Sequence, residues 1–556
     1  MKQTSRQHSF FELITLIFLV IVASYKAAEW SVAGLLPWLH GLFLLTAYLL
    51  VRLVADRLHA RLGVALFAVT ALYLITEIVI QQTTGLHFNL FILSLMQQSG
   101  FTSQIGVSGY SLAAVTFFVF AVALIGAQRL KKPFFVLQGR ILLASTLALG
   151  IAVQGLYGLL FFVGAAEVED VRRKLPLFTA LHPYRSGKIL GLVLNERAEN
   201  PFANRTEIPR KLPDPAARAT FSKGAPNIVL VVTDSLRVKE LRADRTLAPN
   251  LMAWAQSGSL SLDAYSTSNC THFSFYSMFT GKLPTGFGQA RRSKNTVGML
   301  RDFEANGYTI TTAEANPLDL YDVASFLFPK TTERYIALEE NGARASDQAV
   351  TNQTLKILKA AVNSNQPFFH LAYYFGTHYP YDTAFGDDAI DGHTKYLASI
   401  RSFDEEIGKL KRALEKNGQL GNTVVIITSD HGEEFLDTGR IGHASRLTDE
   451  QVKIPMVIIA PEQAKADPAR VRSHMDLMPY ILQMVGVETE PGSGPIFLAN
   501  CSYDFPKGFA VISLEGRADF SYLSGYLTPI RSPNGALADP ALQSKAAAEL
   551  LVKIKN

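Results

Sequence analysis

The sequence has few cysteines and few charges, and these shortages exclude several classes of protein. Two of its 556 residues are Cys, which excludes a framework of several disulfides and any four-cysteine zinc site. Charged residues make up 18% of the chain, and 53 basic against 48 acidic residues leave a net charge of +5. So small a charge argues against nucleic acid as a partner, because such binding relies on a strong basic field. The 48% of hydrophobic residues exclude a disordered chain.

Charges are absent altogether from Ile78 to Gln128, which is unusual for a soluble domain. A membrane-spanning helix needs about 20 apolar residues. The sequence predicts five such helices, at residues 10–25, 31–51, 62–80, 109–127 and 141–163. The first stretch alone resembles a signal peptide, but the four further stretches argue against a secreted protein. Glu77, inside the third stretch, has two interpretations: a buried functional group, or a carboxylate near the helix end that reaches the membrane interface.

The positions of Lys and Arg predict how these helices are oriented. Positive residues gather at the N-terminus and after the second and fourth spans, whereas the loops after the first and third spans carry one Lys between them. Cytoplasmic loops are the ones that carry an excess of Lys and Arg. We therefore expect the N-terminus in the cytoplasm and everything after about residue 165 on the outer side of the membrane.

Changes of composition divide the chain into four parts. We expect a transmembrane domain at 1–164, a juxtamembrane linker at 165–223, an α/β domain at 224–490 and a small C-terminal α/β appendage at 491–556. The basic residues of the linker have two interpretations, contact with anionic lipid headgroups or simple solvation.

Strand and helix patterns alternate in the third part. The predicted strands are 227–233, 308–313, 368–374, 423–428 and 455–459, and a helix is predicted at 396–417. This alternation predicts a mostly parallel sheet with helices on both faces. Ligands of such sheets bind beyond the carboxyl ends of the strands, where Asp234 and Asp430 fall. The phosphate-loop motif G-x-x-x-x-G-K, the dinucleotide motif G-x-G-x-x-G and the zinc motif H-E-x-x-H are all missing.

The pair Asp430-His431 has the chemistry of a metal site. A carboxylate beside an imidazole suits zinc, manganese or magnesium. A lone Asp at a strand end is more often a turn or cap residue, so the signal depends on Asp234 and Asp430 acting together.

Several motifs in this region resemble the sulfatase/alkaline-phosphatase superfamily. Pro226-Asn227-Ile228, followed by an apolar strand and Asp234, resembles the way its domains begin, and Thr280-Gly281-Lys282-Leu283-Pro284 resembles the end of its nucleophile motif. In that register the nucleophile position falls on Thr271, one residue after Cys270. The resemblance continues with the His378-x-Pro380 segment, with Asp430-His431 and with Gly442-His443, and it covers roughly residues 226–490.

This resemblance implies a catalytic site. Thr271 would be the nucleophile, and Asp234, Thr271, Asp430 and His431 would hold one divalent metal ion, with Glu433 and Glu434 as supporting groups. His378 and His443 would bind the substrate. Where many sulfatases have a paired Asp this chain has Asp234-Ser235, which favours a single-metal site.

Apolar spans followed by such a domain most resemble the inner-membrane YejM/PbgA family, and also lipoteichoic acid synthases and phosphoethanolamine transferases. The implied protein is a multi-pass protein of the bacterial inner (cytoplasmic) membrane with a periplasmic or extracellular catalytic domain. Its expected activity is metal-dependent phosphoryl or phosphodiester transfer or hydrolysis on lipid headgroups or envelope glycans. A lipid-sensing regulator with a remnant site and a true sulfatase remain alternatives. The sequence leaves open its protein partners and whether Cys270 and Cys501 form a disulfide.

Overall fold

The chain forms two compact units, Met1–Glu199 with Tyr526–Arg531 and Asn200–Gly525 with Ser532–Asn556. In this computed structural model the described residues of the N-terminal region are 15–21, 34–84, 87–88, 139–162, 168–173 and 175–178. From 219 to 555 the structure describes all residues except 294–295, 339–341, 363, 365, 382–391, 462–465, 490–491, 493, 503–504, 523–526 and 531–537.

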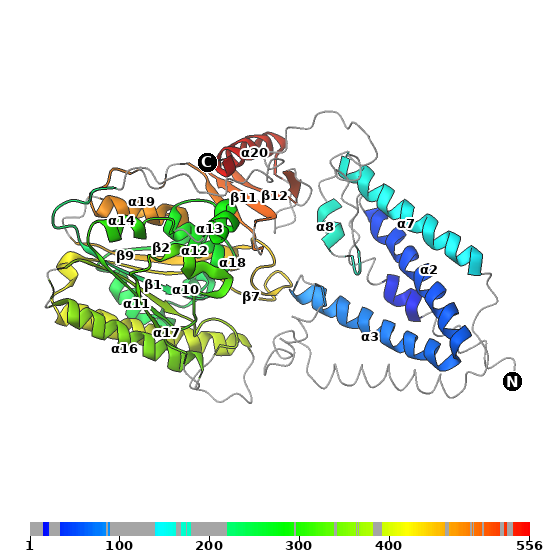
Figure 1. Ribbon diagram of the computed structural model, residues 1–556, viewed down its shortest axis with the longest axis horizontal. Helices are drawn as coiled ribbons and strands as arrows, with labels where there is room; N and C mark the ends of the chain where they lie inside the picture. Colours follow the sequence, from blue (N-terminus) through cyan, green and yellow to red (C-terminus); the bar gives the residue numbers. More distant parts are fainter. Residues whose placement is uncertain are drawn as a thin grey trace. The chain divides into compact units, whose positions relative to one another are not determined.

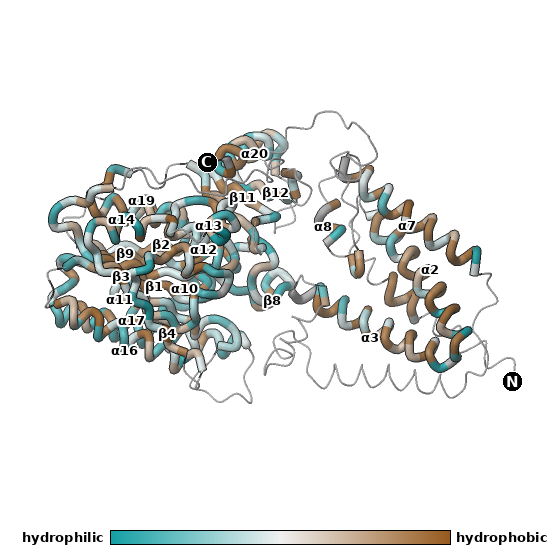
Figure 2. Tube along the Cα trace, viewed as in Figure 1, coloured by the Kyte–Doolittle hydropathy of each residue, from teal (hydrophilic) through white to brown (hydrophobic). Residues whose placement is uncertain are grey.

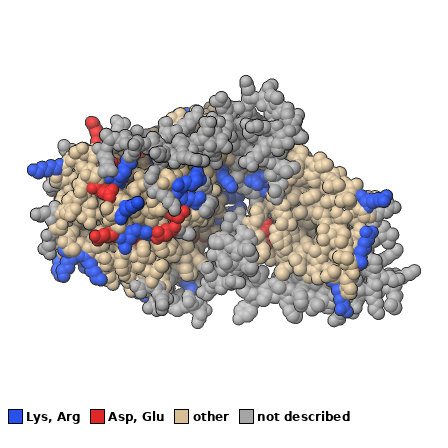
Figure 3. Space-filling model, viewed as in Figure 1, with Lys and Arg blue, Asp and Glu red and all other residues tan. Residues whose placement is uncertain are grey.

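Long apolar helices make up most of the described N-terminal unit. They are α2 (Leu35–Leu58), α3 (Ala60–Thr84) and α7 (Gly139–Phe162), and a short helix α8 (Val168–Arg173) follows. Hydrophobic residues dominate along α2, α3 and α7 (Figure 2), and charged side chains are sparse on the visible face of this unit (Figure 3). Three segments of these helices, Leu35–Leu58, Arg61–Gln81 and Gly139–Leu160, are long and apolar enough to cross a membrane.

These helices correspond to three of the five predicted spans, at 31–51, 62–80 and 141–163. The span predicted at 109–127 lies outside the described residues, and of the span at 10–25 the structure describes residues 15–21, which are helical. Glu77 is buried and accepts a hydrogen bond of 2.8 Å from the backbone N–H of Phe88. Its carboxylate therefore has a local structural partner.

A seven-stranded sheet forms the centre of the second unit, with the strand order β2-β9-β6-β1-β5-β3-β4. Strands β6, β1, β5, β3 and β4 run parallel to one another, whereas β9 runs antiparallel to both β6 and β2. The strands are β1 (Asn227–Thr233), β2 (Ser259–Tyr265), β3 (Thr309–Glu314), β4 (Glu333–Ile336), β5 (Phe368–Tyr374), β6 (Thr423–Ser429) and β9 (Lys453–Ile459). The predicted mostly parallel sheet is confirmed.

Helices cover both faces of this sheet, as parallel strands require. Figure 1 shows α12, α14 and α19 on one side and α11, α16 and α17 on the other. The helices of this domain are α10 (Val238–Ala243), α11 (Pro249–Ala255), α12 (Thr271–Thr280), α13 (Phe287–Ser293), α14 (Leu300–Ala305), α15 (Val323–Leu327), α16 (Ala343–Val362), α17 (Gly392–Lys416), α18 (Asp449–Val452) and α19 (His474–Met484).

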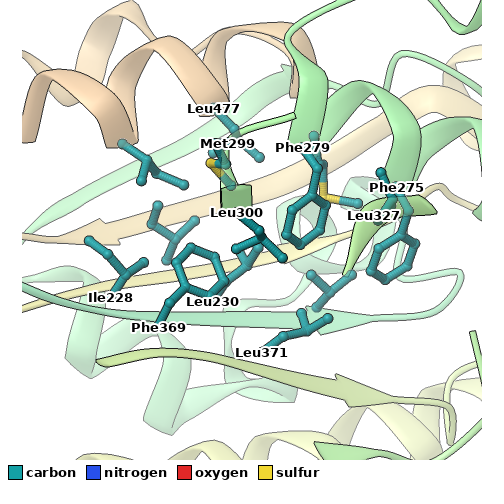
Figure 4. Packing of buried hydrophobic residues seen from close by; sticks show 14 of the residues in the cluster. Ile228, Leu230, Phe275, Phe279, Met299, Leu300, Leu327, Phe369, Leu371 and Leu477 are labelled. Atoms are coloured by element: carbon teal, nitrogen blue, oxygen red, sulfur yellow. The ribbon is translucent and has the colours of Figure 1, made fainter. Parts of the chain in front are cut away.

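Strand β1 is buried on both faces because its side chains alternate between two hydrophobic cores. Ile228, Leu230 and Val232 belong to the core that also includes residues of α12 and α19, whereas Val229 and Val231 belong to the core on the opposite face. Figure 4 shows the first core, in which Ile228 and Leu230 lie near residues from α12, α14, α15 and α19. These two cores fix the position of the carboxyl end of β1.

The C-terminal part adds a small antiparallel sheet and a helix. Strands β10 (Ile496–Ala499), β11 (Gly508–Ser513) and β12 (Gly516–Ser521) pair in sequence order, with a short strand β13 (Thr528–Ile530) and helix α20 (Pro540–Lys555) after them. A two-stranded hairpin, β7 (Glu434–Phe435) and β8 (Ile441–Gly442), follows the central strand β6. This hairpin is important below because residues of the site flank it.

The fully buried His370 in β5 makes the α/β unit sensitive to acid. Its ring nitrogens lie 2.8 Å from the Thr311 hydroxyl and 2.9 Å from the Thr354 hydroxyl, and burial lowers its pKa from 6.5 to about 3. Between these values the unfolded chain binds one more proton than the folded one. The neutral His370 therefore contributes fully to the free energy of unfolding above pH 6.5. As the pH falls below this value, this contribution decreases by about 1.4 kcal/mol per pH unit.

We expect the urea midpoint of the detergent-solubilised protein to fall steadily from pH 6.5 to 4.5, and His370→Asn to flatten this decline. Equal slopes for both proteins would contradict the assignment of the proton uptake to His370.

Candidate active site

Two neighbouring strands of the central sheet deliver the acidic and imidazole groups of the site. Asp234 follows β1 and Asp430-His431 follows β6, and the last residues of these strands, Thr233 and Ser429, lie in register. One potential ligand atom from each of Asp234, Asp430 and His431 lies within 4.8 Å of the other two. All three residues are buried, so the carboxyl ends of β1 and β6 hold them rigidly.

Thr271 reaches this cluster from the first position of helix α12. Its Oγ1 lies 3.5 Å from Oδ2 of Asp234 and 3.4 Å from Nε2 of His431. Residues 272–280 of the helix are buried, whereas Thr271 is partly exposed. The hydroxyl is thus fixed by a buried helix and still accessible to a substrate.

Ser235 and Tyr373 hold the carboxylate of Asp234 in place. Ser235 has φ of +65°, a conformation that costs free energy for a residue other than glycine. In this conformation its hydroxyl donates to Oδ1 of Asp234 at 2.7 Å, while its backbone N–H donates to Oδ1 of Asp430 at 3.0 Å. The Tyr373 hydroxyl donates to Oδ2 of Asp234 at 2.6 Å. Ser235 therefore bridges the two carboxylates.

The carboxylate of Asp430 is only partly satisfied. Oδ1 accepts from the backbone N–H groups of Ser235 and His431, the latter at 2.7 Å. Oδ2 is buried and has no hydrogen-bond partner among the residues that the structure describes, although Nε2 of His431 lies 3.5 Å away. A buried carboxylate oxygen without a partner is costly, and a cation held jointly with Asp234 and His431 would satisfy it. The donors present therefore fit a divalent metal ion.

The pKa values of the two carboxyl groups are displaced in opposite directions. Burial and the neighbouring charge of Asp234 raise the pKa of Asp430 well above its ordinary value. Burial also acts to raise the pKa of Asp234, but electrostatic interactions with the three neighbouring histidines and the hydrogen bond from Tyr373 outweigh it and lower this pKa. Burial lowers the pKa of His431, which favours the neutral imidazole that binds metals.

Two further histidines line the cluster. The ring centroid of His443 lies 4.2 Å from that of His431 and 5.3 Å from that of His378. Nδ1 of His443 contacts Oε1 of the buried Glu433 at 3.1 Å, so this carboxylate fixes the orientation of the ring. The ring of His378 stacks on Phe375. His378 and His443 are thus placed to contact a group bound at Thr271.

A buried ion network supports the turn after β1 from the other side. Arg237 is 1% exposed and its Nε donates to Oε2 of Glu240 at 2.7 Å, while Nη1 donates to the carbonyl of Glu433 at 3.0 Å. The same guanidinium forms an ion pair with Asp437 of the loop between β7 and β8. Arg237 therefore connects the turn that carries Asp234 with the segment that carries Glu433.

Replacing Arg237 with Met is expected to lower the free energy of unfolding by about 3–5 kcal/mol, because Glu240 and Asp437 would lose a buried partner. Arg242→Met is the matched control, in helix α10, which begins directly after Arg237. Arg242 pairs with the exposed Asp263, and such pairs contribute about 0–1 kcal/mol. Urea unfolding followed by the fluorescence of the buried Trp254 measures both. Equal losses in the two variants would contradict the structural role of the Arg237 network.

The structure answers the question about the cysteines. Cys270 and Cys501 form a disulfide, with 5.6 Å between their Cα atoms. Their sulfur atoms and His272 lie close together, but disulfide sulfurs are not thiolates, so this group does not have the ligands of a metal site.

All six residues predicted for the site lie around this one cluster: Asp234, Thr271, His378, Asp430, His431 and His443. Sequence reasoning missed Tyr373 and the bridging role of Ser235. The position of Tyr373 could have indicated its role. It carries a hydroxyl group near the carboxyl end of β5, the strand that pairs with β1. Glu433 was expected only as a supporting group, and the structure places it against His443.

Comparison with known proteins finds sulfatases that are similar to this part of the chain. The Sulfatase family model matches residues 226–487. The sequence is 33% identical to an uncharacterized sulfatase, YidJ, of Escherichia coli over 103 residues, which are 18% of this chain. It is 35% identical to an N-acetylglucosamine-6-O-sulfatase of Bacteroides thetaiotaomicron over 95 residues, which are 17% of this chain. These alignments span 20% and 17% of the lengths of the two relatives.

Among solved structures, the lipoteichoic acid synthase LtaP of Listeria monocytogenes aligns with 17% identity and a TM-score of 0.47, over 60% of this chain and 92% of LtaP. The likeness to sulfatases rests on the sequence match, which covers every residue of the cluster described above. Residues 226–487 of this chain are therefore similar to the Sulfatase family.

Proposed function

We propose that this chain is a membrane-anchored, metal-dependent phosphoryl or phosphodiester transferase or hydrolase that acts on lipid headgroups or envelope glycans through Thr271. The observation that carries the proposal is the partly exposed Thr271 hydroxyl, 3.5 Å from Asp234 and 3.4 Å from His431. Its place at the N-terminus of α12 also favours an anionic group, because the helix dipole is positive there. The apolar N-terminal helices support a substrate at the membrane.

A threonine hydroxyl is a weak nucleophile near neutral pH and needs activation. A zinc, manganese or magnesium ion held by Asp234, Asp430, His431 and the Thr271 oxygen would lower the pKa of the hydroxyl and offset the charge of the transferred group. Tyr373 and Ser235 keep the two carboxylates in place for this task.

The reaction follows from the positions of the remaining side chains. The Thr271 hydroxyl loses its proton to solvent and its oxygen attacks phosphorus. The bond from phosphorus to the leaving alcohol breaks, and His443 or His378 gives the leaving oxygen its proton. Glu433 orients His443 through its contact with Nδ1. Water or an acceptor hydroxyl then attacks phosphorus and gives its proton to the same histidine. The bond from phosphorus to the Thr271 oxygen breaks, and this oxygen regains a proton from solvent, which restores the free enzyme.

A sulfuric ester hydrolase is the second candidate, because the family model and two of the relatives are sulfatases. Sulfatases convert a Cys or Ser at the nucleophile position into formylglycine. Here the sulfur of Cys270 is bonded to Cys501, and Thr271 is the residue that faces the acidic cluster. The disulfide of Cys270 and the position of Thr271 beside the acidic cluster support the phosphoryl-transfer candidate over the sulfatase.

The full-length protein in detergent, loaded in turn with zinc, manganese and magnesium, tests both candidates. The probes are p-nitrophenyl phosphate, bis(p-nitrophenyl) phosphate and p-nitrophenyl sulfate. We expect release of nitrophenol from a phosphate ester, and accurate-mass analysis of the quenched enzyme should find a phospho-group on the peptide that contains Thr271.

Turnover of the sulfate ester alone would replace the proposal with the sulfatase candidate. Metal binding without turnover of any ester or of membrane phospholipid would favour a lipid-sensing regulator with a remnant site. Our proposal predicts neither result.

A further inference from the structure

The C-terminal sheet makes close contact with the residues around Thr271. We define the nucleophile turn as residues 267–272 and the supporting segment as residues 499–502, which begins at the last residue of β10. Ser268 and Ala499 form a parallel bridge, and the backbone N–H of Ala499 donates to the carbonyl of Thr267 at 2.8 Å. The supporting segment is therefore joined to the nucleophile turn by a single backbone bridge.

Both neighbours of Thr271 are attached to the same segment. Cys270, before Thr271, is bonded covalently to Cys501. Nε2 of His272, after Thr271, lies 2.8 Å from the carbonyl oxygen of Ser502. The reactive residue thus lies between two anchored positions.

Asn269 completes the connection and extends it to the His443 side of the site. Its Oδ1 accepts from the backbone N–H of Cys501 at 2.8 Å, and its Nδ2 donates to Oδ1 of Asn500 at 2.8 Å. Its backbone carbonyl accepts from the N–H of Ala444, the residue after His443, at 3.0 Å. Asn269 is fully buried. One residue, through its side chain and its backbone carbonyl, therefore ties together the nucleophile turn, the supporting segment and the loop after His443.

Such anchoring matters because Thr271 is the first residue of its helix. The N–H groups of the first helical turn have no partner inside the helix, so the position of this turn depends on what holds the preceding residues. Cys270, the residue before the helix, makes no side-chain capping hydrogen bond, and its side chain is used by the disulfide instead.

We propose that the supporting segment positions Thr271 for reaction, with the Cys270–Cys501 disulfide as its covalent anchor, so that turnover depends on the oxidation state of this pair. This inference rests on the proposed function, because it assigns Asn269, Cys270 and Cys501 as positioning residues for the Thr271 nucleophile. The small C-terminal sheet thereby contributes to the active site by positioning Thr271.

Reduction of the folded, metal-loaded, full-length protein tests the proposal. Tris(2-carboxyethyl)phosphine takes oxygen from water to become the phosphine oxide, and the disulfide gains two electrons and two protons to give two thiols. Maleimide labelling and mass spectrometry measure how much of the pair is reduced. With bis(p-nitrophenyl) phosphate as the probe, we expect kcat to fall about tenfold to a hundredfold, because small displacements of a reacting group have effects of this size.

The accompanying readouts distinguish positioning from a role in stability alone. KM and the metal dissociation constant should change much less than kcat, since three of the four proposed metal ligands, Asp234, Asp430 and His431, follow other strands. Reoxidation with glutathione disulfide should restore kcat.

The variant Cys270→Ser/Cys501→Ser should have the low kcat of the reduced protein and no response to the phosphine, whereas Lys545→Gln in α20 should behave as the wild type. Unchanged kcat in fully reduced protein overturns the proposal, even if the melting temperature falls.

Hydrogen exchange of the peptide 267–275 supplies a readout that does not need turnover. We expect reduction to accelerate exchange in this peptide and to leave the peptide 227–233 protected. If the oxidised protein hydrolyses no probe but exchange responds in this way, the proposed function fails while the anchoring of the nucleophile turn is supported. If exchange does not respond to reduction, the anchoring itself is overturned. This test uses the wild-type protein, so it remains valid even if the variant Cys270→Ser/Cys501→Ser does not fold.

Discussion

Replacing Thr271 with alanine is expected to lower kcat by at least about a thousandfold, because the variant loses the atom that attacks phosphorus. The domain should remain folded, since Thr271 is partly exposed at the start of α12 and the rest of this helix is buried in the core. Initial rates with bis(p-nitrophenyl) phosphate, together with the urea midpoint of each protein, measure the two effects separately.

Two substitutions in the same helix serve as controls. Thr271→Ser keeps a hydroxyl at the same place and should retain measurable turnover. Thr280→Val removes a hydroxyl at the other end of α12, where Oγ1 donates to the carbonyl of Tyr276, and should change stability but not kcat. Wild-type activity in Thr271→Ala would show that another group is the nucleophile. Ser274 does not replace it readily, because its buried hydroxyl donates to the carbonyl of Ser268.

The central strands and the acidic cluster could be predicted because they depend on local pattern and one topological rule. The continuous apolar run 227–233 is typical of a strand buried on both faces, and β1 has these bounds in the structure. Asp234 and Asp430 follow strands that proved to be neighbours, and the carboxyl ends of parallel neighbours meet at one edge. Thr271 came from the resemblance of its motif, since nothing in a threonine at the start of a helix indicates a nucleophile.

Features that depend on contacts between distant segments were not predictable. The edge strands β2 and β4 are only partly buried, so they lack the apolar signal of the central strands. The pairing of Cys270 with Cys501 spans 231 residues, and sequence alone left it open. Tyr373 became part of the site only through the pairing of β5 with β1, which directs its hydroxyl to Asp234.

Removing the metal ion is expected to stop turnover, because the Thr271 hydroxyl would then lack the charge that activates it. Chelation with EDTA should abolish hydrolysis of bis(p-nitrophenyl) phosphate, and adding back zinc, manganese or magnesium one at a time should identify the ion that restores it. Asp430→Asn should weaken binding of that ion by at least about a hundredfold, since it removes a charged ligand. Full turnover in EDTA would contradict a metal-dependent mechanism.

Stability should respond to Asp430→Asn in opposite directions with and without the ion. Without metal, Asp430 and Asp234 are buried like charges, and burial together with the charge of Asp234 raises the pKa of Asp430. The neutral Asn relieves this repulsion, so in EDTA the variant should unfold at the same urea concentration as the wild type or a higher one. At a metal concentration 100 times the dissociation constant of the wild type, the free energy of unfolding of the wild type should rise by about 2.7 kcal/mol and that of the variant hardly at all.

The control Glu434→Gln alters a buried carboxylate bonded to Gln451 and should leave the metal-induced gain intact. A gain of equal size in Asp430→Asn would exclude Asp430 as a ligand, because a residue that does not bind the ion cannot change the linkage between binding and folding.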